Sequence, residues 1–301
     1  MRQFDFLGKT KYFVPLSIIL VVVSVICLIP QVRGLKMGID FTGGTEFTVM
    51  FSESIDTADL RATLGTINAG DVDLTKSTIQ NVGGGNTKVI TTQLLDVAED
   101  ERVIDRIEET LEETYPVEDI SRRLISNAVG QKLAQKGWQA VLLAVIAILV
   151  YISWRFRLRY AIGAVAAIVH DVVIALGLFA IFGVEVNLAT IAAFLTIVGY
   201  SLNDTIVIYD RIRENLKVER RRSIFDIINL SVNQSLSRTL NTSITTFIPV
   251  IILFVFGGSV LRGFSLALLI GVIVGTYSSM YIANPILYAW TLKAGGAKGS
   301  K

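Results

Sequence analysis

Long apolar runs alternate with polar stretches along the chain, and this pattern predicts six membrane-spanning helices. The runs cover residues 12–29, 138–153, 160–182, 186–209, 240–256 and 264–290. A helix of about 20 apolar residues crosses the ~30 Å hydrocarbon core of a bilayer. The second run is short, but the helix-compatible residues 131–137 precede it, and Pro285 is expected to bend or end the last run. The chain is therefore predicted to be a multi-pass membrane protein.

The polar stretch between the first two runs has a pattern of its own. Strands are predicted at 45–51, 72–82, 87–95 and 117–125, helices at 57–67 and 98–114, and a hairpin turn at 83–86. Asp56 or Thr57 is expected to cap the first helix. The order βαββαβ predicts a small α+β domain of ferredoxin-like type, a fold that says little about chemistry.

Lysine and arginine residues give the orientation of the helices. Sixteen of them fall on one side of the predicted membrane, in the N-tail, the 153–160 turn, the 210–239 loop and the C-tail, against Arg262 alone in the short loops of the other side. Short cytoplasmic loops carry the excess of positive charge. Both termini are therefore predicted to be cytoplasmic. The predicted units are an N-tail with the first helix (1–30), an extracytoplasmic domain (31–136), a five-helix bundle (137–292) with a cytoplasmic loop (210–239), and a C-tail (293–301).

Composition excludes several classes of function. The chain is 52% hydrophobic, and its formal net charge of +2 gives no sign of nucleic-acid binding. One cysteine and one histidine supply no cluster for metal or nucleophilic chemistry, and GxSxG and HExxH motifs are absent. No enzyme activity, metal or bound cofactor is predicted. The basic residues at 220–222 are expected to form a solvated face near anionic membrane lipids.

Asp204 is the leading candidate for function, because an ionisable side chain within a bilayer needs a partner or water. It lies six residues before Asp210, roughly 9 Å above the predicted cytoplasmic end of its helix. Arg238 lies where the next helix enters the membrane from the same side, so the two residues are expected at similar depth. They can form a pair that makes and breaks with protonation. The alternative is a fixed salt bridge that only fastens two helices.

Other polar residues extend this candidate proton path. Asn203 and Asn241 crowd the same region together with Ser201 and Thr205, which favours a polar seam. His170 and Asp171 lie near the middle of the third helix. That pair is either an interhelical hydrogen-bond site or an element of a proton path.

Glycine-rich segments have simpler interpretations. Residues 38–45 (GIDFTGGT) match no nucleotide-binding pattern and predict a turn at the membrane surface, with Asp40 as a structural residue. Gly271 and Gly275 have the GxxxG spacing of close helix packing.

Three segments together resemble a known family. Residues 38–45, 198–215 (VGYSLNDTIVIYDRIREN) and 235–243 (SLSRTLNTS) resemble the SecF branch of the SecD/SecF family, in the RND superfamily, and the resemblance covers essentially the whole chain. It implies a six-helix half that pairs with a SecD subunit into a twelve-helix unit. That unit assists the SecYEG channel and the SecA motor, with YajC and YidC as further candidate partners. It implies that the proton motive force promotes late steps of preprotein translocation, and that Asp204 and Arg238 are the proton-path acid and arginine.

The resemblance leaves points open. Proton is the expected coupling ion, and sodium stays open. The second hypothesis is an RND-type half-transporter that exports small hydrophobic molecules, and a third is a passive scaffold that clamps a channel. The predicted location is the cytoplasmic (inner) membrane.

Overall fold

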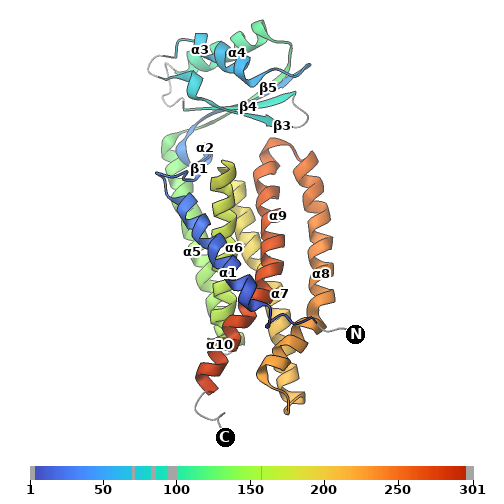
Figure 1. Cartoon of the computed structure of the whole chain (residues 1–301). Helices are drawn as coiled ribbons and strands as arrows, with labels where there is room; N and C mark the ends of the chain where they lie inside the picture. The colour runs from blue at the N-terminus through green and yellow to red at the C-terminus, as the bar shows by residue number, and fades with distance from the viewer. Residues whose placement is uncertain (1–3, 70–71, 83–85, 94–99, 157, 296–301) are drawn as a thin grey trace.

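A bundle of long helices carries a small α+β domain at one end (Figure 1). The computed structural model describes residues 4–69, 72–82, 86–93, 100–156 and 158–295. Within these residues, six helical segments are long and apolar enough to cross a membrane. The prediction of a six-helix membrane bundle with an α+β domain is confirmed.

Most helices of the bundle are longer than their apolar runs, and the last run is divided between two helices. The helices of the bundle are α1 (Thr10–Leu28), α5 (Asn127–Arg155), α6 (Leu158–Phe182), α7 (Leu188–Val218), α8 (Ile224–Phe256), α9 (Gly258–Tyr281) and α10 (Ala283–Gly295). Helices α6, α7 and α9 form the inner layer, with about half of each apolar segment buried. Only 11–17% of the corresponding segments of α1, α5 and α8 is buried, so these three lie outside the inner layer.

The predicted loop 210–239 is instead a helical hairpin. Helix α7 continues to Val218 and α8 begins at Ile224, with Ser223 as its side-chain N-cap. Buried apolar residues on both arms pack together, and Asn215 donates hydrogen bonds to Ser231 Oγ and Gln234 Oε1 (2.8 Å each). Hydropathy detects only the apolar part of a helix. The predicted helices therefore stopped where the sequence became polar, although α7 and α8 continue beyond those points.

The last apolar run is interrupted at Ile282, between α9 and α10. Pro285 has no N–H for the carbonyl four residues earlier, which explains a break in this turn. Carbonyl groups near the break find other donors: Tyr209 Oη donates to Ala283 O (3.0 Å), and Asn284 Nδ2 donates to Ser279 O (2.8 Å).

The α+β domain has the predicted order of elements. Strands β2 (Gly44–Phe51), β3 (Thr78–Val82), β4 (Thr87–Thr92) and β5 (Val117–Ile125) form an antiparallel sheet in the order β3-β4-β2-β5. Helices α3 (Thr57–Thr66) and α4 (Asp100–Thr114) cover one face, with Asp56 as the N-cap of α3. This is the ferredoxin-like arrangement. The predicted strand 72–82 begins later, after a 3-10 turn, η1 (Leu74–Lys76), and the predicted turn 83–86 lies largely outside the described residues.

A separate apolar core holds this domain together. It is made by one face of the sheet and the inner faces of the two helices, with Phe47, Leu60, Ile90, Ile107 and Leu111 all at most 1% exposed. Because this core is closed and the bundle has its own, the domain meets the bundle through its edges and its connecting segments.

Candidate functional site

Helix α7 holds Asp204 rigidly inside the bundle. The helix starts at a capping box formed by Asn187 and Thr190. It packs against α9, where a side chain at Gly271 would overlap Ile197 and a Cβ at Gly275 would lie 3.1 Å from Ser201. The close packing predicted for the two glycines is therefore observed, and it fixes the depth of the residues that follow.

Asp204 is a buried acid with weak hydrogen bonding. Its side chain faces α8, and the residue is 3% exposed. The nearest donor is Thr242 Oγ1 at 3.5 Å, but this hydroxyl has one proton and lies closer to Thr239 O (2.9 Å). Asp204 Oδ2 has no hydrogen-bond partner among the described residues. A carboxyl group in this position is well placed to hold a proton or a water molecule.

Arg238 lies one helical turn before Thr242 on α8. Its side chain is exposed, and among the described residues no ion pair within 4.0 Å joins it to Asp204. By helix rise, Asp204 lies about 24 Å and Arg238 about 27 Å from the outer ends of their helices. The two residues thus share a depth, and their pairing stays a prediction.

The remaining residues of the predicted seam divide between two faces. Ser201 and Thr205 are buried beside Asp204, whereas Asn203 and Asn241 are exposed. Ser243 Oγ and Thr276 Oγ1 hydrogen-bond at 2.6 Å across α8 and α9. The inner face is therefore lined with hydroxyl groups, and the asparagines point away from it. Sequence reasoning missed Thr242, because a threonine one turn after an arginine carries no distinctive signal.

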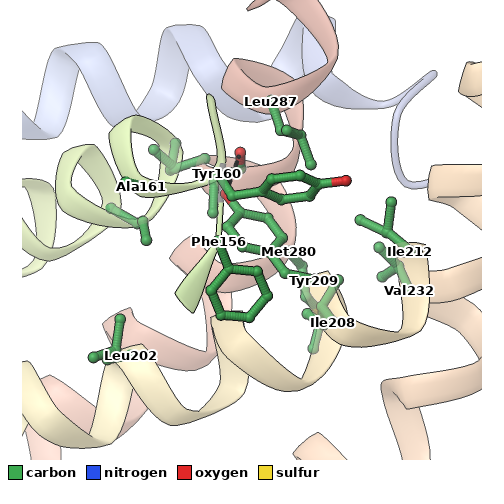
Figure 2. Close-up of a cluster of buried hydrophobic side chains, with 14 of the residues drawn as sticks. Phe156, Tyr160, Ala161, Leu202, Ile208, Tyr209, Ile212, Val232, Met280 and Leu287 are labelled. Carbon is green, nitrogen blue, oxygen red and sulfur yellow. Dashed lines mark hydrogen bonds between the residues drawn. The ribbon is translucent and has the colours of Figure 1, made fainter. Parts of the chain in front are cut away.

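A large apolar cluster lies between Asp204 and the end of the bundle that is far from the α+β domain. Figure 2 shows Ile208, Tyr209 and Ile212 of α7 gathered with Phe156, Tyr160, Met280 and Leu287 from other segments of the chain. Tyr209 and Ile212 are 0% exposed. This cluster separates the polar seam from that end of the bundle.

His170 and Asp171 form a second polar cluster in the inner layer. His170 Nδ1 lies 2.8 Å from Asp171 Oδ1, and the histidine and aspartate side chains are 6% and 1% exposed. Asp171 Oδ2 accepts hydrogen bonds from Ser201 Oγ of α7 (2.6 Å) and Ser278 Oγ of α9 (2.7 Å). Asp171 thus connects α6, α7 and α9 as an interhelical hydrogen-bond site, which is one of the two roles that the sequence left open for this pair.

The glycine-rich segment links the domain to α7. Residues Ile39–Thr42 form a short helix, α2, followed by Gly43 and Gly44 at φ +73° and +127°, conformations that favour glycine. Asp40, which is 6% exposed, accepts the backbone N–H of Leu188 at Oδ2 (2.8 Å) and pairs with Arg123 of β5 at Oδ1 (3.0 Å). The segment is therefore a structural joint between bundle and domain.

Further contacts reinforce this joint. Strand β1 (Lys36–Met37) pairs in parallel with β6 (Glu185–Val186), and Arg262 Nη1 donates to Asn81 O at 2.8 Å. Burial, with the nearby Glu46 carboxylate, raises the pKa of Glu185 above its ordinary value of 4.5. The domain and the outer end of α7 are held together by polar contacts that depend on charge.

Within the described residues, no group of three or more His, Cys, Asp or Glu side chains could hold a metal ion. A buried carboxyl group can bind a proton, and this is the chemistry that we consider below. Asp204 and the pair His170 and Asp171 are the described intramembrane groups that fit it.

Sequence and structure comparisons agree on one family. The family described as protein export membrane protein SecD/SecF, C-terminal, matches residues 106–293, and the SecD/SecF GG motif matches residues 32–55. The protein translocase subunit SecF of Petrotoga mobilis is 42% identical over 294 residues, covering 95% of this chain and 96% of that protein. The protein of the same name from Desulfurispirillum indicum is 42% identical over 292 residues, covering 95% and 91%.

Solved structures give the same result. The crystal structure of SecDF, a translocon-associated membrane protein from Thermus thermophilus, matches with a TM-score of 0.85 and 33% identity over 96% of this chain. A structure of SecDF in a super-membrane-facing form matches with a TM-score of 0.70 and 32% identity over 100% of this chain. The chain spans 39% and 40% of those two longer chains.

Proposed function

The chain belongs to the SecD/SecF family of protein export membrane proteins, and we propose that it uses the proton motive force to promote late steps of preprotein translocation. We propose further that it does so paired with a SecD subunit and beside the SecYEG channel and SecA, with YajC and YidC as accessory partners. The observation that carries the proposal is Asp204, a buried acid with an unpartnered oxygen at the centre of the bundle.

The proposed location is the cytoplasmic membrane, with both termini in the cytoplasm. The charge asymmetry of the loops supports this orientation. The two termini lie at the end of the bundle opposite the α+β domain (Figure 1), so the domain would be extracytoplasmic.

The exposed intramembrane face of the α7–α8 hairpin supports pairing with a second subunit. Arg238, Asn203 and Asn241 are exposed on it at the depth of Asp204. An exposed guanidinium is costly in hydrocarbon, so a partner helix that covers this face would stabilise it. A partner carboxylate could then compete with Asp204 for Arg238.

Helix α7 offers a direct connection from the proton site to the domain. Asp204 lies near its middle, and the N–H of Leu188 at its outer end is bound by Asp40. Protonation of Asp204 removes a charge from the seam, so that α7 and α8 repack, and the displacement reaches the domain through this joint. One proton moved across 100 mV supplies about 2.3 kcal/mol, enough to shift a two-state equilibrium by roughly fifty-fold.

The test replaces Asp204 with Asn, which keeps the shape and removes the titratable proton. Asp210→Asn is the matched control, because Asp210 lies on the same helix but is partly exposed and paired with Arg213 (3.6 Å). We expect Asp204→Asn to copurify with SecD but to lose gradient-dependent completion of export in a strain depleted of the native subunit. Asp210→Asn should behave like wild type. Wild-type export and proton flux in Asp204→Asn would refute the proposal and favour a passive scaffold.

The exporter hypothesis is not favoured. The relatives are translocase subunits, a transport role in protein export, and the side chains of the α+β domain fill its apolar core.

A further inference from the structure

The proposed function uses Asp204 and leaves the buried His170–Asp171 cluster without a role. We propose that His170 Nε2 is a second proton-binding position of the bundle, with Asp171 as its counter-ion. The His170 side chain also lines the groove between α1 and α10. It lies in the inner layer, where its neighbour Asp171 accepts a hydrogen bond from Ser201 of α7. Ser201 is one helical turn before Asp204 on that helix.

The hydrogen bonds around Asp171 assign the protons. Its Oδ2 accepts two serine hydroxyls, so that oxygen carries no proton. The contact of 2.8 Å between Oδ1 and His170 Nδ1 then holds one proton, and imidazole is the stronger base of the two side chains. His170 is therefore the Nδ1–H tautomer beside an ionised carboxylate. Its remaining nitrogen, Nε2, has a free lone pair.

The free nitrogen has no partner within the protein. Nε2 is buried and lacks a hydrogen-bond partner among the described residues, and the side chain is 6% exposed. His170 lines a groove of about 710 Å³ whose other walls are Val14 and Ile18 of α1 and Pro285 of α10. Packing does not explain this basic nitrogen, because an unpaired polar atom in a buried position destabilises the fold. A proton or a proton-carrying water satisfies it.

The other titratable groups around His170 do not compete with its Nε2 atom as the proton-binding position. Lys11 of α1 is the one other ionisable side chain among the described groove residues, and the α10 residues of the groove are apolar. The Tyr277 ring of α9 stacks at 6.1 Å, and its hydroxyl donates to Phe13 O (2.7 Å). From α7, Ser201 contacts Asp171, and Asp204 lies one turn further on. Asp171 is therefore the charge that would stabilise an imidazolium.

Proton binding at this position would be sensed by three helices. A protonated His170 pairs with Asp171 and draws charge away from Oδ2, where the hydroxyls of Ser201 and Ser278 attach α7 and α9 to α6. Ser201 also lies close to Gly275 of α9, so these hydrogen bonds are next to the close contact between α7 and α9. Loading of the site would weaken the attachment of α7, the helix that carries Asp204.

The chain contains one histidine, so a histidine label reports on His170 alone. The experiment is ¹⁵N NMR of the full chain labelled at histidine, in lipid nanodiscs together with an unlabelled SecD partner. Spectra are recorded from about pH 5 to about pH 8, the interval in which an unperturbed histidine changes charge. We expect an unprotonated Nε2 with a protonated Nδ1 at high pH, and protonation of both nitrogens on acidification. A histidine that stays in the Nε2–H tautomer, or that does not respond to pH, would overturn the inference.

Two variants sharpen the result. In Asp171→Asn the imidazolium signal should be lost over the same pH range, because its counter-ion is gone. Tyr277→Phe keeps the stacked ring and removes only the hydroxyl, so the signals should match wild type. An imidazolium signal in Asp171→Asn equal to that of the wild type would contradict the role of Asp171 as counter-ion. If this variant fails to fold, the spectra of the wild type alone test the inference. The outcome is independent of export: Asp204→Asn tests the proposed function, while the histidine signals of that variant should follow those of the wild type.

Discussion

Asp40 offers the sharpest test of how the domain is attached to the bundle. Its carboxylate accepts the Leu188 N–H at 2.8 Å and pairs with Arg123 at 3.0 Å, and the residue is 6% exposed. Asp40→Asn keeps an oxygen for the Leu188 N–H but removes the charge. Asp40→Ala removes both interactions and leaves a backbone N–H without its acceptor.

The structure gives the size of the effect. Arg123 is 48% exposed at its side chain and also contacts Glu46 at 3.3 Å, so solvent and a second carboxylate moderate the loss of its pair with Asp40. We expect Asp40→Asn to weaken the joint by about 1 kcal/mol. For Asp40→Ala we expect about 2–3 kcal/mol, because a buried donor is also left unsatisfied. Each 1.4 kcal/mol is about tenfold in the opening equilibrium.

Amide hydrogen exchange measures this opening directly. In detergent or nanodiscs, exchange at the first turn of α7 should speed up roughly fivefold in Asp40→Asn and thirtyfold or more in Asp40→Ala. Asp119→Asn is the control, because Asp119 is exposed on β5, the strand that carries Arg123. Equal exchange in Asp40→Ala and Asp119→Asn would show that Asp40 does not hold the joint, and the proposed coupling path through it would be wrong.

Three further predictions concern packing and charge. Gly271→Ala should destabilise the bundle by about 1–3 kcal/mol in thermal unfolding, because its Cβ would overlap Ile197, whereas Gly199→Ala, with open space around it, should change little. Gly44→Ala should lower the melting temperature of the domain, because φ is +127° and the Cβ would lie 2.6 Å from a carbonyl oxygen of β4. Glu185 has a raised pKa, mainly from burial, so the folded joint binds more protons than the open one between pH 4.5 and that raised value. Protection from exchange at the joint should therefore fall as pH rises through this window, and a joint in Glu185→Gln that keeps the same pH dependence would contradict the assignment.

Hydropathy and alternation were enough to predict the number of spanning helices and the order of elements in the domain, because both follow from local patterns of burial. The same patterns failed where helices leave the membrane. The predicted loop 210–239 is a helical hairpin, since Asn215 and its partners stabilise polar helices that no apolar run marks. The break at Ile282 lies in the turn before Pro285, as the sequence predicted, but the hydrogen bond from the Tyr209 hydroxyl to Ala283 O could not be read from it.

The candidate site shows a similar division. Asp204 stood out in the sequence because a charge in an apolar run is rare, and Arg238 followed from helix direction. Asp40 was expected to be structural, but its partner could not be predicted, because its hydrogen bond to Leu188 joins residues 148 positions apart. The bridge from Asp171 to Ser278 joins residues 107 apart. A serine in a helix has no pattern that reveals such a partner.

The position of these three acids on or against α7 bears on how a proton could move a distant domain. Asp40 binds the outer end of the helix, Asp171 contacts Ser201 near its middle, and Asp204 lies one turn beyond. A helix transmits an axial shift along its length because its backbone hydrogen bonds resist stretching, whereas the contact of 3.5 Å from Thr242 to Asp204 resists little. Of these three polar attachments of α7, the weakest is thus at the proposed proton site. A charge change at Asp204 is therefore better converted into movement of the whole helix with its domain than into local rearrangement.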